Sequence, residues 1–73
     1  MARIIGHQKF HSKAKDKDYI RVYFTWSDDA VKGEACDTTV VGVEYFDKLV
    51  KGSDDLRVGY DKEQKSRFLY VGR

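Results

Sequence analysis

Hydrophobic and polar residues alternate most regularly along residues 19–26, YIRVYFTW. The even-numbered positions of this segment are all apolar: Ile20, Val22, Phe24 and Trp26. The odd-numbered positions are Tyr19, Arg21, Tyr23 and Thr25. Alternation with a period of two is typical of a strand that buries one face. The pattern therefore predicts a strand with its even-numbered side chains in the core and two tyrosines around an arginine in solvent.

Other segments have β-favouring residues and predict further strands at residues 3–11, 35–43, 56–60 and 67–73. Gly6 interrupts the first of these segments and predicts a bulge or a sharp bend there. The polar stretches between strands predict turns at residues 12–18, 27–34 and 61–66.

One segment follows a helical period instead. Within residues 43–51 the apolar positions recur at i, i+3, i+6 and i+7, namely Val43, Phe46, Leu49 and Val50. Acidic residues come early in this segment and lysines late, as the helix dipole prefers, and Gly52 follows as a natural stop. The segment predicts a helix of about two turns.

The predicted order is strand, strand, strand, short helix, strand, strand, and residues 1–73 are expected to form one domain. Five short strands bury little as an open sheet, whereas a closed barrel removes the exposed edges. We therefore expect an all-β fold, a small five-stranded OB-like barrel whose helix between strands 3 and 4 plugs one end with Phe46 and Leu49. An SH3-like barrel is the structural competitor, although it normally has no helix in that place.

Composition narrows the class of protein. Hydrophobic residues make up 41% of the chain and aromatic residues 14%, which argues against disorder. Cys36 is the only cysteine, so an intrachain disulfide cannot form, and a reducing cytoplasm is expected. In a segment rich in Thr and Val, this cysteine is expected to act as a small hydrophobe. No apolar run approaches the ~20 residues of a membrane span, and the first residues do not resemble a signal peptide.

Charge is distributed unevenly along the chain. Residues 1–26 carry six basic and two acidic side chains, a net charge of +4. Residues 27–56 carry three basic and eight acidic side chains, a net charge of −5, and residues 57–73 carry five basic and two acidic, a net charge of +3. If the two ends of the chain pack together, the domain has a basic face and an acidic flank, an asymmetry that bears on partners.

The solvent-facing side of residues 19–26 is the predicted binding surface. Exposed aromatic rings offer π faces on which bases of any identity stack, and basic side chains around them can follow a phosphate backbone. The predicted nucleic-acid-binding residues are Tyr19, Arg21, Tyr23, His7, Lys9, Lys13, Lys15, Lys17, Lys65 and Arg67. The alternative for the tyrosine face is a sheet cover or a homodimer contact. Asp16 and Asp18 partly neutralise the lysine-rich turn.

The layout RIIGHQKF, YIRVYFTW, KGEACDTTVVGVEYFD and LRVGY resembles the small OB-fold single-stranded DNA-binding proteins of phages and mobile elements, the gene V-like helix-destabilising group. The resemblance covers most of the chain. It implies a homodimer that coats single-stranded DNA in replication or transfer. By position, Arg21 and Tyr23 match outward strand residues of that family, and the lysines of residues 13–17 lie at its DNA-binding loop. The last hairpin departs from the family because it lacks a glycine turn.

No arrangement of residues predicts catalysis, a cofactor or a metal. His7 and His11 would lie about 13 Å apart on a strand, at ~3.3 Å per residue, which is too far to share an ion. The expected function is binding of single-stranded DNA without sequence preference, with RNA as a further ligand to consider. The alternative is a non-enzymatic protein-interaction module that uses the same face or the acidic residues 44–55.

Overall fold

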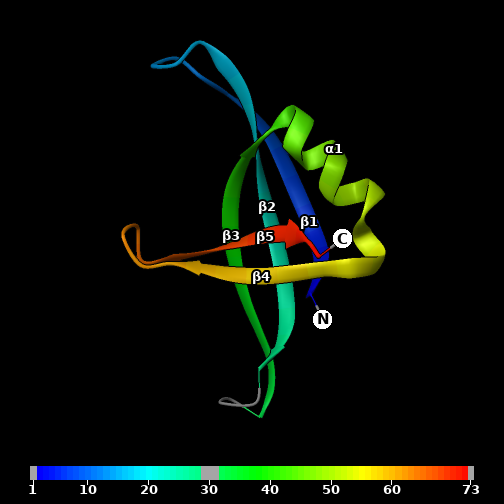
Figure 1. Cartoon of the computed structure of the whole chain (residues 1–73). Coiled ribbons are helices and arrows are strands. Elements are labelled where there is room, and N and C mark those ends of the chain that lie inside the picture. The colour runs from blue at the N-terminus through cyan, green and yellow to red at the C-terminus, as the bar shows by residue number, and fades with distance from the viewer. Residues whose placement is uncertain (1, 29–31, 73) are drawn as a thin grey trace.

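The computed structural model describes residues 2–28 and 32–72 and is mostly β-structure (Figure 1). Its elements are β1 (Ala2–Ser12), β2 (Lys17–Asp28), β3 (Gly33–Gly42), α1 (Val43–Lys51), the 3-10 turn η1 (Ser53–Asp55), β4 (Leu56–Asp61) and β5 (Ser66–Val71). The predicted order of strands and helix is confirmed, and α1 has the predicted bounds. Residues 29–31 of the predicted turn and Arg73 of the predicted last strand lie outside the described residues.

The first three strands form an antiparallel sheet with β2 in the centre. The side chains of Ile20, Val22 and Phe24 are buried on one side of β2, and Trp26 packs partly buried against the same core. Tyr23 on the other side is 36% exposed. The predicted assignment of faces in residues 19–26 is therefore confirmed. We call the side of this sheet that carries Val22 the inner face and the side that carries Tyr23 the outer face.

A bulge in β1 changes which of its residues face inward. Ile4 pairs with Phe24 and Gly6 pairs with Tyr23, so Ile5 is an extra residue in the ladder, close to the bend predicted at Gly6. Residues directly opposite each other in an antiparallel pair share a face, so even-numbered positions face inward before the bulge and odd-numbered positions after it. The bulge therefore places His7 on the inner face and Phe10 on the outer face.

The helix and the β4–β5 hairpin cover the inner face of the sheet. Leu49 of α1 is fully buried and Phe46 packs partly buried against the same core, as predicted, whereas Val43 and Val50 of the predicted apolar face are exposed. Leu56 of β4 and Leu69 of β5 are also buried in this core. In Figure 1, β4 and β5 run across the strands of the first sheet, with α1 alongside. The outer face of the β1–β2–β3 sheet remains uncovered by these elements.

The five strands form two sheets, and among the described residues no closed barrel is formed. The strand β5 contacts β3, and β4 contacts β1, but hydrogen-bonded ladders join only neighbours within each sheet. The hairpin crosses the other strands at a steep angle in Figure 1, and crossed backbones cannot form a ladder. The domain measures 40 × 26 × 20 Å, and the turn between β1 and β2 projects from one end. Within the described ranges, no helix is long and apolar enough to cross a membrane.

Candidate nucleic-acid interface

Aromatic and basic side chains alternate across the outer face of β1 and β2. Phe10 of β1 lies opposite Tyr19 of β2, and their ring centroids are 6.1 Å apart. The Arg21 guanidinium lies 5.9 Å from the Phe10 ring centroid, and the Lys15 ammonium lies 5.7 Å from that of Tyr19. Tyr23 follows on the same face of β2. We name the set Phe10, Tyr19, Arg21 and Tyr23 the aromatic row.

Two of the three rings of the aromatic row are exposed, and the third, that of Tyr19, is half-buried beside Phe10. Phe10 and Tyr23 are each 36% exposed, and Arg21 is exposed. Cation–π contacts of this kind hold a guanidinium near a ring at a modest gain of about 0.5–1 kcal/mol when exposed. Arg21 is thereby positioned on the sheet face beside the Phe10 ring, where it can stack on a base or bind a phosphate.

The carboxylate of Asp18 lies on the opposite side of the sheet from this row. Asp18 pairs with His11, and its Oδ1 lies 3.0 Å from His11 Nδ1, while its Oδ2 lies 3.8 Å from Lys9 Nζ. The hydrogen bond from His11, helped by the Lys9 charge, lowers the pKa of Asp18 below its ordinary value. The negative charge of Asp18 is thus engaged on the inner side and does not pair with Arg21.

Three lysines expected at the site lie in or next to the β1–β2 turn. Lys13 and Lys15 belong to the turn, and Lys17 begins β2 at an outward-facing position. Among the described residues of the three strands, the outward positions hold a single carboxylate, Glu34, which lies 3.4 Å from Arg3 at the far end of the sheet. The turn itself also holds Asp16, whose carboxylate lies 3.3 Å from His11, so the turn and the aromatic row form a surface of net, not uniform, positive charge.

Two of the predicted residues face the other way. Because of the bulge at Ile5, His7 pairs with Val22 and Lys9 pairs with Ile20, which places both on the inner face. The His7 ring lies 4.9 Å from that of Phe46 in α1. The structure therefore does not bring His7 and Lys9 together with the tyrosines.

The residues expected from the last hairpin are also separate from the aromatic row. Lys65 lies in the β4–β5 turn, which points away from the sheet in a different direction from the β1–β2 turn in Figure 1. The Arg67 guanidinium lies 5.1 Å from the ring centroid of Trp26 and 5.6 Å from that of Tyr60. Arg67 is partly buried and joins the hairpin to the inner face of the sheet, so its position favours a structural role.

Phe10 was not among the predicted residues, although it is part of the aromatic row. A sequence signal for it existed, because a bulge at Gly6 reverses the faces of the residues that follow.

The prediction that Cys36 acts as a small hydrophobe is wrong. Cys36 is exposed on the outer face opposite Thr25 and does not pack as a small hydrophobe, because the outer side of β3 has no covering layer.

The polar residues of the described ranges are not arranged as a metal centre, since no group of three or more His, Cys, Asp or Glu is placed to hold an ion there. His11 illustrates this, because Asp18 lies on its Nδ1 side at 3.0 Å and Asp16 lies on its Nε2 side at 3.3 Å. The two carboxylates thus approach the ring from different sides.

Comparison with family models, with curated proteins and with solved structures finds no match for this chain. The chemistry of the outer face itself is therefore the basis for a function.

Proposed function

We propose that this protein binds single-stranded DNA, largely without sequence preference, through the outer face of the β1–β2–β3 sheet. The aromatic row is the observation that carries the proposal, because exposed rings next to cations are what unpaired bases and their phosphates require. Base stacking does not distinguish strongly between bases, which accounts for the lack of sequence preference.

An OB-like architecture is part of the same proposal. Contacts of β5 with β3 and of β4 with β1 bring the ends of the two sheets together, which supports a partly open barrel. OB-folds bind oligonucleotides on the face around strands 2 and 3 and on the neighbouring loops. In this chain the β2 members of the aromatic row and the β1–β2 turn would belong to that binding face, whereas Phe10 comes from β1 and β3 contributes no member of the row.

Four basic residues adjoin the proposed strand path: Lys13, Lys15, Lys17 and Arg21. If they neutralise about four phosphates, the logarithm of the binding constant should fall against the logarithm of salt concentration with a slope of about −3. The assay is a titration of a fluorescent oligo(dT) of about twenty nucleotides at several salt concentrations. Absence of binding at low salt would overturn the proposal and favour the protein-interaction alternative.

Tyr23→Ala tests the aromatic row directly. Stacking of one base contributes roughly 1–3 kcal/mol, so the affinity for oligo(dT) should fall by about 5- to 100-fold. Tyr70 provides a matched control, since it is 37% exposed but faces away from the sheet on the hairpin. Tyr70→Ala should bind as tightly as the parent, and circular dichroism should verify that both variants are folded. Equal affinities of the parent and Tyr23→Ala would remove Tyr23 from the site.

A further inference from the structure

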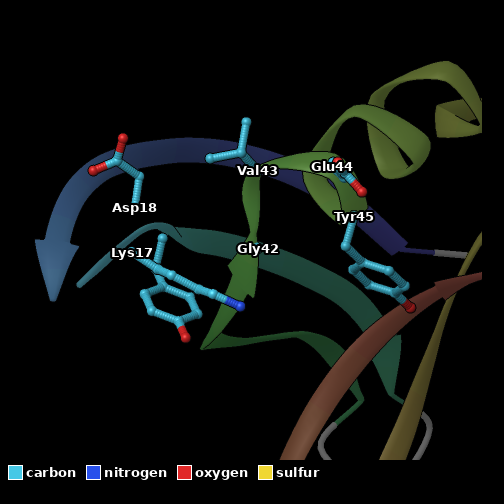
Figure 2. A pocket seen from close by; sticks show the side chains of 7 residues that line it. Lys17, Asp18, Gly42, Val43, Glu44 and Tyr45 are labelled. Carbon is cyan, nitrogen blue, oxygen red and sulfur yellow. The ribbon is translucent and has the colours of Figure 1, made fainter. Parts of the chain in front are cut away.

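An open depression lies between the beginning of β2 and the first turn of α1, at one end of the aromatic row. Its volume is about 550 Å³, within the usual range of small-molecule sites. Figure 2 shows Gly42 at its middle, with Lys17 on one side and Tyr45 on the other. Tyr19, a member of the aromatic row, also lines it.

Gly42 leaves space that the fold does not need. Its backbone has φ −71° and ψ 162°, an extended conformation that any residue adopts. A Cβ atom added at Gly42 would meet nothing within 4 Å. Neither backbone strain nor crowding therefore requires glycine here, and its effect is to keep the depression open opposite Tyr19, its partner in the ladder.

Two tyrosines supply aromatic surface to the depression. The Tyr45 hydroxyl donates a hydrogen bond of 2.7 Å to the carbonyl oxygen of Leu69, which anchors the far end of the ring to β5. The Tyr45 side chain is nevertheless 39% exposed. Tyr19 contacts Phe10 of the aromatic row and Lys15 of the β1–β2 turn, so it belongs both to that row and to the depression.

The charges around the depression favour a neutral ligand over a phosphate. Its lining residues include Asp18, Glu44 and Lys17, and the Asp18 carboxylate is already engaged by His11 and Lys9. The remaining charges, one carboxylate and one ammonium group, balance each other and give no net attraction for phosphate. A nucleobase is neutral and flat, and its N–H groups can donate hydrogen bonds to carboxylates.

We propose that this depression holds one unpaired nucleobase of the single strand that lies along the aromatic row. The base stacks on the tyrosine surface beside Gly42, while the phosphates on either side of it remain near the lysines of the β1–β2 turn. This inference rests on the proposed binding of single-stranded DNA and adds a defined place where the strand leaves the row.

Gly42→Leu tests the inference by filling the depression without straining the backbone. Loss of one stacked base should weaken oligo(dT) binding by about 5- to 100-fold. The slope of affinity against salt should not change, because no phosphate contact is removed. Ser27→Leu is the control, since Ser27 is exposed on the outer-facing side of β2 at the opposite end of the strand. This control should bind as the parent does.

Photocrosslinking gives a readout on the parent protein that does not depend on any variant. An oligonucleotide of 5-iodouracil crosslinks to aromatic side chains that stack on its bases. Trypsin separates the three tyrosines, because Tyr19, Tyr23 and Tyr45 fall in the tryptic peptides 18–21, 22–32 and 33–48. We expect a crosslink in peptide 33–48 that Gly42→Leu removes, while the crosslink in peptide 22–32 persists.

The outcomes separate the two proposals. Crosslinking at Tyr23 but not at Tyr45, with the same affinity for Gly42→Leu and the parent, would overturn the base site and leave the proposed function standing. If the parent binds no oligonucleotide at low salt, both proposals fall together.

Discussion

Replacement of Arg67 by alanine should destabilise the protein rather than weaken nucleic-acid binding. The guanidinium lies 5.1 Å from the ring centroid of Trp26 and 5.6 Å from that of Tyr60, and the residue is partly buried. A cation–π contact contributes about 0.5–1 kcal/mol when exposed and about 2 kcal/mol when desolvated. Two such contacts at intermediate burial give about 1–3 kcal/mol for Arg67→Ala.

The expected loss is large for a domain of 73 residues. A change of 1 kcal/mol shifts the Tm of a domain of this size by roughly 4–8 °C, so Arg67→Ala should lower the Tm by about 5–20 °C. Arg67→Lys keeps the charge but loses the planar group that stacks on rings, so its Tm should lie between that of the parent and that of Arg67→Ala. Thermal unfolding followed by circular dichroism gives the Tm values. Fluorescence of Trp26, the only tryptophan, reports the contact itself.

Lys62→Ala is the matched control, because Lys62 is an exposed cation in the turn of the same hairpin. Exposed substitutions of this kind usually change stability by no more than about 0.5 kcal/mol. The contrary result would be that Arg67→Ala unfolds at the temperature of the parent, with unchanged Trp26 emission, and binds oligo(dT) more weakly. That result would mean that Arg67 contacts nucleic acid and contributes nothing to joining the hairpin to the sheet.

Two further predictions concern the core and the β1–β2 hairpin. Leu49→Ala should lower the free energy of unfolding by about 2–5 kcal/mol in urea titrations, because Leu49 is fully buried. Val50→Ala, on the exposed side of α1, should change it little. A loss below about 1 kcal/mol for Leu49→Ala would contradict the packing of the helix. The lowered pKa of Asp18 means that its contribution to stability is present above its unfolded value of about 3.8 and is lost as the pH falls through the folded value. His11→Ala should raise the pKa of Asp18 in an NMR titration of its carboxyl carbon, and an unchanged pKa would show that this hydrogen bond is not its cause.

Local periodicity determined much of the fold. The alternation along residues 19–26 was sufficient to assign Val22 and Phe24 to the core and Tyr23 to solvent, because burial of one strand face is decided by nearest-neighbour geometry. The helical spacing and the glycine after residues 43–51 likewise defined α1. Of the proposed site, the pattern alone identified three members of the aromatic row, Tyr19, Arg21 and Tyr23.

Tertiary structure decided which of the remaining side chains share a surface. One extra residue, Ile5, reverses the faces of β1, so Phe10 joins the tyrosines while His7 and Lys9 turn inward. The crossing of the β4–β5 hairpin over the sheet places Arg67 between rings and leaves two sheets instead of a closed ladder. Such features depend on register and on contacts between segments far apart in the chain. Hydrophobic spacing reports only which side of an element is buried, and it contains no information on what lies against that side.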